Sequence, residues 1–266
     1  MLVVGGSTGL TGAACMASEA ALRAGAGVVT AAVPATLNGI FEQKLTEVMT
    51  IPLADTGYGH LAEQALDPLL GAAENFDSVA LGPGLGRDHE SAGLVAKFLG
   101  RSAATVVLDA DGLGAVAGKL SLLKRRQAPS ILTPHTGELA RLPGADVNEI
   151  KAHRLTAAKS AAKKSGSIIV LKGSSTIITD GRETVLSPTG NPGLATAGSG
   201  DVLTGVIAAL AAKGLRPFDA AAAGVYIHGL AADMAAEEAG EDNLIATDLI
   251  DYLPLAFAGL QEENED

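Results

Sequence analysis

The segment from Asn191 to Gly214 constrains the fold more than any other part of this 266-residue chain. Its first part, residues 191–200, reads NPGLATAGSG, and that abundance of Gly, Pro, Ser and Thr is typical of a loop. From Asp201 the chain is small and apolar, with a spacing that predicts a helix buried around most of its circumference. Gly214 is expected to end this helix in the left-handed conformation. The pattern predicts a glycine loop that leads directly into a buried helix.

Such a junction is a candidate anion site, because the first N–H groups of a helix lack intrahelical partners and carry the positive end of its dipole. Gly198 and Gly200 have no Cβ atom, so a phosphate can approach their N–H groups closely. Asp201 has two interpretations. It can be an ordinary helix N-cap. Alternatively, it is a general base that takes a proton from a hydroxyl while the loop amides hold a phosphoryl group. The sequence leaves both interpretations open.

The rest of the chain alternates between predicted strands and helices. Strands are predicted at residues 2–4, 25–33, 78–81, 105–108, 130–132 and 168–171, with a β-hairpin over 176–186. Helices are predicted at residues 12–24, 60–72, 146–164, 201–214, 217–238 and 247–259. Helical crossovers between parallel strands predict an α/β fold of three layers, αβα, with a mostly parallel central sheet. We expect a single domain over residues 1–266, of which residues 261–266 form a frayed acidic tail.

Ligands bind such sheets outside the C-terminal ends of the strands. Loops that follow predicted strands or lead into helices are therefore expected to meet at one edge of the sheet. These loops lie at Gly5, Gly82, Asp109, Thr133, Lys172 and Gly198. The Gly82 loop, GPGLG, is either a simple tight turn or a loop whose three glycines and proline fix a particular backbone shape.

Polar side chains follow two of these strands. Asp111 is expected to cap a short helix, whereas Asp109 is left open, with a hydrated Mg²⁺ as one alternative. His135 and Glu138 are three residues apart, which predicts a shared helix face and a polar pair that touches the substrate. Zinc is not expected, because no third ligand lies nearby and Cys15 is remote.

Composition narrows the classes of partner. A formal net charge of −11 argues against nucleic acid as a partner, but it permits anionic small ligands held by local dipoles. Hydrophobic residues make up 47% of the chain, yet no apolar run is long enough to span a bilayer. The first residues lack the pattern of a secretory signal. We expect a cytoplasmic protein without disulfides, since Cys15 is the single cysteine.

Several blocks, in this order, resemble the ADP/ATP-dependent NAD(P)H-hydrate dehydratases of the ribokinase-like superfamily. They are GGSTGLTGAA, LRAGAGVVTAAVP, LGPGLGRD, LDADGL, TPHTGE, VLKGSSTIITDG and NPGLATAGSGDVLTG, and they cover nearly the whole chain. The resemblance implies a ribokinase-like fold and a carbon–oxygen lyase of metabolite repair. In that reaction a nucleotide phosphorylates the hydroxyl of the S-form of NAD(P)H hydrate, and elimination of phosphate restores NAD(P)H. The chain looks like a stand-alone dehydratase domain, without the epimerase domain of bifunctional members.

The resemblance also implies roles for individual residues. Asp201 matches the catalytic acid–base residue, which also contacts the substrate. The other positions are Gly198, Ser199 and Gly200 as the anion hole, Ala13, Gly84 and His135 in the substrate pocket, and Lys172, Gly173, Ser174, Ser175 and Thr176 with Gly200 at the nucleotide. Mg²⁺ is expected as the counterion of ADP or ATP, with no protein metal ligands assigned. Thr136 departs from the usual family proline, and Ala197 to Ser199 replace Gly-Gly-Thr.

Two other functions stay open at this point: a ribokinase-like kinase of a small alcohol, such as a vitamin precursor, and a non-catalytic nucleotide-binding sensor. The intact Asp201 argues against the sensor. Family members are typically oligomeric, so we expect a homo-oligomer, with a tetramer among the options. The sequence does not decide between ADP and ATP, or between NADH and NADPH hydrate.

Overall fold

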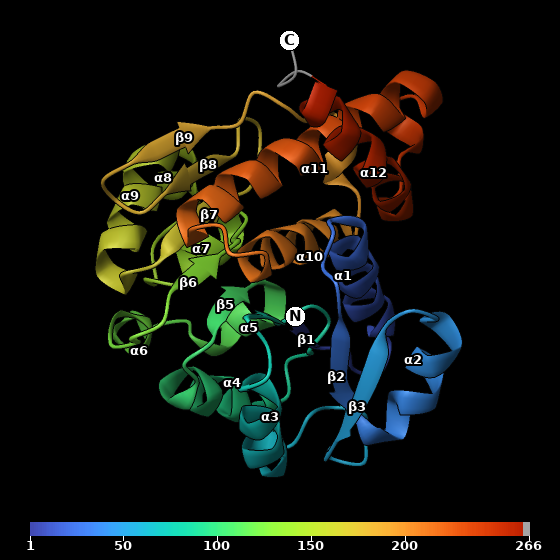
Figure 1. Ribbon diagram of the computed structural model, residues 1–266. Coiled ribbons are helices and arrows are strands. Elements are labelled where there is room, and N and C mark those ends of the chain that lie inside the picture. Colours follow the sequence, from blue (N-terminus) through green and yellow to red (C-terminus); the bar gives the residue numbers. More distant parts are fainter. Residues whose placement is uncertain (263–266) are drawn as a thin grey trace.

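The computed structural model describes residues 1–262 and contains a nine-stranded sheet with the order β3-β2-β1-β4-β5-β6-β7-β8-β9 (Figure 1). Its strands are β1 (Leu2–Val4), β2 (Thr30–Pro34), β3 (Met49–Leu53), β4 (Ser78–Leu81), β5 (Thr105–Leu108), β6 (Ser130–Leu132), β7 (Ile168–Leu171), β8 (Ile177–Thr179) and β9 (Thr184–Leu186). Strands β1 to β7 pair in parallel, whereas β8 and β9 add an antiparallel hairpin. The predicted mostly parallel sheet is confirmed.

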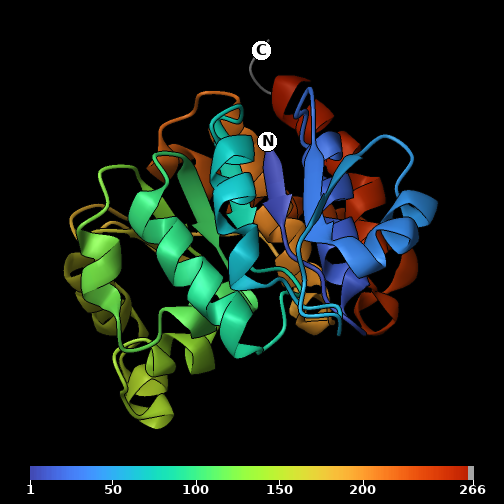
Figure 2. The same ribbon diagram turned by 90° about the horizontal axis from the view of Figure 1, so that it is seen from below.

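Helices cover both faces of the sheet. One face carries α1 (Thr11–Arg23), α2 (Asn38–Lys44), α10 (Ser199–Ala212), α11 (Pro217–Ala239) and α12 (Ala246–Glu262). The other carries α3 (Leu66–Ala73), α4 (His89–Arg101), α5 (Ala110–Ala115), α6 (Leu120–Lys124), α7 (Thr136–Arg141), α8 (Val147–Ala152) and α9 (Arg154–Ser165). In Figure 2 the teal and green helices lie in front of the strands and the orange and red helices lie behind them. The predicted three layers are confirmed.

Alternate residues of the central strands fill two separate cores, because successive side chains of a strand point to opposite faces. Val3, Val107 and Val170 belong to the core under α1 and α10. Leu108 and Leu171 belong to the core on the opposite face. Both faces of the sheet are therefore covered by apolar side chains. This explains why the sequences of these strands are continuous apolar runs and do not alternate between apolar and polar residues.

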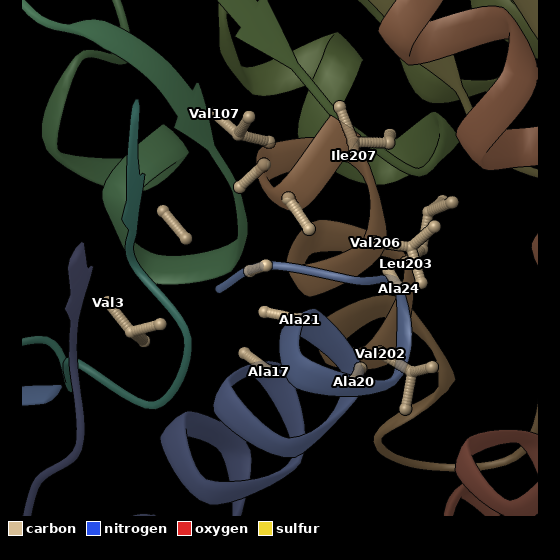
Figure 3. Close-up of a cluster of buried hydrophobic side chains, with 14 of the residues drawn as sticks. Val3, Ala17, Ala20, Ala21, Ala24, Val107, Val202, Leu203, Val206 and Ile207 are labelled. Carbon is tan, nitrogen blue, oxygen red and sulfur yellow. The ribbon is translucent and has the colours of Figure 1, made fainter. Parts of the chain in front are cut away.

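Small residues bring α1 and α10 into close contact above the sheet. Ala17, Ala20 and Ala21 of α1 lie beside α10 in Figure 3. A Cβ atom on Gly205 would lie 2.1 Å from the Ala17 carbonyl oxygen, so the two backbones approach as closely as glycine allows. This contact fixes α10, and with it the loop that precedes α10.

Some elements differ from the sequence prediction. Helices α2, α4 and α6 and the edge strand β3 were not predicted from the sequence. Strand β3 contains a proline, and only one of its five residues is buried, features that weaken a strand signal. The predicted strand at 25–33 begins only at Thr30, and the predicted helix at 60–72 begins with a 3₁₀ turn, Glu63–Ala65. The helix predicted at 146–164 is two helices, because His153 leaves the helical conformation.

The C-terminal end also differs. Residues 261–262 continue α12 rather than beginning a tail, and the rest of the predicted tail, 263–266, lies outside the described residues. No helix within residues 1–262 combines the length and the apolar character needed to cross a membrane.

Candidate active site

Loops after five strands meet at one edge of the sheet, as predicted. Gly82 donates its N–H to the Val4 carbonyl at 3.0 Å, and Gly6 donates to the Pro83 carbonyl at 2.9 Å. The next loops are joined in the same way, through bonds from the N–H groups of Asp109 to Leu81, of Thr133 to Leu108 and of Lys172 to Pro134. These backbone bonds hold the chemistry-bearing residues of separate βα units against one another.

The glycine loop before α10 is a preformed anion site. Gly198, with a φ of 93°, starts the helix, and the Ser199 hydroxyl donates to the Leu194 carbonyl at 2.7 Å. Within the part of the chain that the structure describes, the N–H groups of Ser199, Gly200 and Asp201 have no hydrogen-bond acceptor. Three free donors at the positive end of a 14-residue helix can hold a phosphoryl group.

Asp201 is not the N-cap of α10. The left-handed Gly198 takes that place, so Asp201 is the third residue of the helix and its side chain makes no capping bond. The N-cap interpretation is therefore wrong. A 3₁₀ turn, Pro192–Ala195, also replaces part of the predicted irregular loop, and Asn191 caps it through a bond of 2.9 Å from the Gly193 N–H.

A lysine and a buried carboxylate lie in front of the free N–H groups. Asp109 is 1% exposed, and it accepts hydrogen bonds of 2.9 Å from both Lys172 Nζ and the Thr204 hydroxyl. A Cβ atom on Gly200 would lie 3.0 Å from Lys172 Nζ, so the glycine lets the ammonium group stand close to the helix start. The missing Cβ thus serves the positioning of Lys172 as well as the approach of an anion.

Electrostatics leave Asp201 ready to exchange a proton near neutral pH. Burial raises its pKa to about 7, and the carboxylates of Asp109, Asp111 and Glu138 also raise it, against the opposing effect of Lys172. Burial alone would lower the pKa of Lys172, but Asp109 and the other carboxylates outweigh it and raise that pKa. The lysine therefore stays protonated, whereas Asp201 has the pKa that suits a general base.

A cavity of about 500 Å³ opens beside this network. The predicted nucleotide residues Lys172, Gly173, Ser174, Ser175, Thr176 and Gly200 all line it. The opposite wall comes from α11, through Val225, His228 and Gly229. The structure therefore brings the predicted nucleotide-binding residues together around one hollow that ends at the helix start.

The residues predicted to bind substrate make the following local contacts. Gly84, with a φ of 62°, lies against Ala13, whose Cβ is 3.0 Å from the position of a Cβ on Gly84. His135 caps α7 instead, because its Nδ1 accepts from the N–H groups of Gly137 at 3.0 Å and Glu138 at 3.3 Å. The predicted shared helix face of His135 and Glu138 is therefore wrong, since His135 precedes the helix.

The prediction that Asp111 caps a helix is also wrong. Asp109 stands at the N-cap position of α5, without a side-chain capping bond, and Asp111 lies in the first turn. Its carboxylate accepts from the Gly86 N–H at 3.0 Å. The GPGLG loop is therefore tied to α5 and is more than a tight turn.

Three polar residues of the site region were missed from the sequence. Thr204 holds Asp109, His228 lines the cavity, and Asp233 accepts hydrogen bonds from the Gly190 N–H and the Asn191 side chain at 2.9 and 3.0 Å. Thr204 belongs to α10, and His228 and Asp233 both belong to the Ala-rich α11. The only available signal was a polar residue within an otherwise apolar pattern, which does not say what it contacts.

With this geometry in place, comparisons with known proteins identify relatives. The sequence model of the family described as NAD(P)H-hydrate dehydratase matches residues 1–255. The chain is 49% identical over 267 residues to the bifunctional NAD(P)H-hydrate repair enzyme Nnr of Moorella thermoacetica, covering 100% of this chain and 50% of the relative. The chain thus spans about half the length of several curated relatives that it matches.

Two further relatives match over most of their own length. The ADP-dependent (S)-NAD(P)H-hydrate dehydratase of Xanthomonas campestris is 35% identical over 258 residues, covering 96% of this chain and 86% of the relative. The solved structure of the ADP/ATP-dependent NAD(P)H-hydrate dehydratase of Bacillus subtilis, co-crystallised with ATP/Mg²⁺, is 31% identical with a TM-score of 0.80, covering 97% of this chain and 88% of that one.

Proposed function

Because the chain belongs to the NAD(P)H-hydrate dehydratase family, we propose that it converts the S-form of NAD(P)H hydrate back to NAD(P)H, using ADP or ATP as phosphoryl donor. One observation of the site carries the proposal. A carboxylate with a pKa of about 7, Asp201, lies within the same helical turn as free N–H groups and close to the Lys172 ammonium. Phosphorylation of a hydroxyl requires a base that takes the hydroxyl proton and an anion site that binds the phosphoryl group, and this arrangement supplies both.

The chemistry assigned to these residues is a transfer followed by an elimination. Asp201 takes the hydroxyl proton of the hydrate while the oxygen attacks the terminal phosphorus, and the bond to the remaining nucleotide breaks. The free N–H groups of Ser199 and Gly200, together with the N–H of the preceding Gly198 and the ammonium of Lys172, stabilise the charge on the phosphoryl oxygens. Phosphate then leaves with the electron pair of the C–O bond, and a proton lost from the neighbouring carbon completes the double bond. Hydroxide would be a far poorer leaving group than phosphate.

The same proposal assigns the two sides of the site. Lys172 to Thr176 and Gly200 bind the nucleotide, which occupies the cavity of about 500 Å³. The hydrate lies on the side of Ala13, Gly84 and Asp201, and the exposed edge of the His135 ring is assigned to the same pocket. The GPGLG loop, fixed by Asp111, forms its wall.

Mg²⁺ is proposed as the counterion of the nucleotide. Among residues 1–262 no group of three or more His, Cys, Asp or Glu side chains could hold a metal ion. The site therefore suits a cation that is bound chiefly through phosphate oxygens and water, as is usual for Mg²⁺, with Asp109 and Asp201 nearest to the anion site. When bound, it would neutralise phosphate charge.

We also propose that residues 1–266 act as one domain, because every strand found within residues 1–262 belongs to one sheet. A homo-oligomer is proposed because large apolar side chains are exposed on the edge strand β9 and before α12, including Leu186 at 55% and Ile245 at 56%. A cytoplasmic location is proposed from the nucleotide substrates.

The decisive experiment is an absorbance assay on NADH hydrate, in which the reduced nicotinamide is followed with ADP, with ATP and with neither. We expect recovery only with a nucleotide, and none with Asp201→Asn, because the variant cannot accept the hydroxyl proton. A folded wild-type protein that binds ADP yet restores no NADH with either nucleotide would contradict the proposal. In that case a small-alcohol kinase becomes the next hypothesis.

A further inference from the structure

His228 is a buried polar side chain to which neither the sequence analysis nor the proposed chemistry gives a role. It lies in α11, is 6% exposed and lines the nucleotide cavity. Its Nε2 is 3.0 Å from the Ser199 carbonyl oxygen. A carbonyl can only accept, so Nε2 carries the hydrogen and donates it. Burial lowers the pKa of His228 to about 4, and the ring is therefore neutral at pH 7.

The bond acts on a peptide group that belongs to the anion site. The Ser199 carbonyl and the Gly200 N–H are two ends of one planar peptide and point in opposite directions. Fixing the carbonyl on His228 therefore fixes the direction of the Gly200 N–H, one of the three free donors. Glycine restricts its own backbone least, so an external restraint has the most effect at this position.

Other contacts show that α11 holds the whole loop. Asp233 accepts hydrogen bonds from the Gly190 N–H and the Asn191 side chain, and the Tyr226 carbonyl accepts from the Thr189 hydroxyl at 2.9 Å. These contacts fix the beginning of the loop, and His228 fixes its end at the helix start. A buried histidine with a packing role alone could satisfy its N–H with any acceptor in the core. His228 instead bonds a peptide group of the anion site.

We propose that His228 is a positioning residue, which orients the Ser199–Gly200 peptide so that the Gly200 N–H meets the phosphoryl group during transfer. This inference rests on the proposed function, since it names how that site is held. His228 itself transfers no proton and makes no bond to the reacting atoms. The expected loss is therefore in turnover more than in nucleotide binding.

Two substitutions separate the hydrogen bond from the packing. His228→Leu fills the space with an apolar side chain that has no hydrogen-bond donor. His228→Gln supplies an amide N–H at a similar distance from the backbone. We expect His228→Leu to lower kcat about 10- to 100-fold, with a much smaller change in the KM of the nucleotide. This is less than the roughly 100- to 1,000-fold loss on removing an oxyanion donor outright, because the Gly200 N–H is still present but less well aligned. His228→Gln should recover most of kcat. His89→Leu, a matched change at a side chain that is 90% exposed, should behave as wild type.

Three results would overturn the inference: an unchanged kcat in His228→Leu, equal loss in both variants, or a rise in nucleotide KM with unchanged kcat. A second readout does not need the hydrate. AMP or ADP with aluminium fluoride imitates the transferring phosphoryl group, and calorimetry measures its binding against the nucleotide alone. His228→Leu should lose the extra affinity that wild type and His228→Gln show. A wild type that binds this mimic but restores no NADH would count against the proposed function and leave the inference supported by binding.

Discussion

At the scale of single residues, the site holds charges where burial opposes them. Asp201 keeps its carboxyl among three other carboxylates, and the Lys172 ammonium offsets only part of that repulsion. Asp109, which is almost fully buried, is satisfied by Lys172 and Thr204 and so serves as a fixed negative charge. The balance raises the pKa of Asp201 to about 7 and makes its protonation state sensitive to pH in the physiological range.

The first prediction concerns the pH dependence of the reaction. If Asp201 is the base, only its ionised form is active, so kcat/KM should rise about tenfold per pH unit below its pKa of about 7 and level off above it. The measurement is kcat/KM for NADH hydrate from pH 5.5 to 8.5 at saturating nucleotide. A flat profile below pH 7 would assign the proton transfer to another group.

The second prediction concerns stability. The folded pKa of Asp201 is raised from 3.8 to about 7, so the folded state binds its proton more tightly than the unfolded state. This contribution is fully present below about pH 4 and is lost as pH rises through 7. The amide of Asp201→Asn does not ionise, so the variant keeps the stability that wild type loses at high pH. It should therefore raise Tm by a few degrees at pH 8 and hardly at all at pH 4.5. Equal shifts at both values of pH would rule out ionisation as the cause.

At the scale of elements, the position of the anion site depends on how closely α10 can approach α1. Gly205 lets the α10 backbone rest on the Ala17 carbonyl, while Ala17, Ala20 and Ala21 keep the facing surface of α1 flat (Figure 3). The small side chains bury little area each, but they allow two whole helices to pack against the sheet and each other. A change at this contact therefore displaces the start of α10.

The third prediction tests that contact. Gly205→Ala would place a methyl group 2.1 Å from the Ala17 carbonyl, and we expect a loss of about 1–3 kcal/mol in the free energy of unfolding from overpacking. Gly71→Ala is the matched control, because its Cβ meets nothing within 4 Å in α3, and it should gain up to about 1 kcal/mol from helix propensity. Denaturant titration measures both. A neutral Gly205→Ala would show that the helices can separate without cost.

At the scale of the whole molecule, the nucleotide cavity joins parts of the chain that are distant in sequence. Its walls come from the turn after β7, the loop before α10 and the middle of α11. A ligand that fills this cavity therefore contacts both the antiparallel end of the sheet and the helices on one face. Binding should stabilise these parts together.

The fourth prediction follows from this arrangement. ADP or ATP at 100 times its Kd should stabilise the folded state by about 2.7 kcal/mol, because it binds the folded form alone. The measurement is a single, cooperative rise in Tm with nucleotide concentration. Asp201→Asn should show the same rise, since Asp201 does not line the cavity. A nucleotide that shifts only part of the transition would contradict the coupling of these elements.

Patterns in the sequence were sufficient to predict the layered fold, the order of most strands and helices, and the meeting of the loops at one sheet edge. These follow from local patterns: apolar runs, glycine turns, and the rule that parallel strands place their C-terminal ends together. The same patterns indicated Asp201, the glycines before it and the stretch from Lys172 to Thr176. Edge strand β3 was not predicted, because Pro52 and the partly exposed residues of the strand weaken the strand signal.

The contacts of the polar side chains became known from the three-dimensional structure. It showed that Gly198 rather than Asp201 begins α10, that Asp111 binds the GPGLG loop, and that His135 caps its own helix. It also brought Thr204 to Asp109 across 95 residues and His228 to Ser199 across 29. Local pattern reports which face of a helix is buried, whereas a hydrogen-bond partner depends on how separate elements pack, and no spacing within one element contains that information.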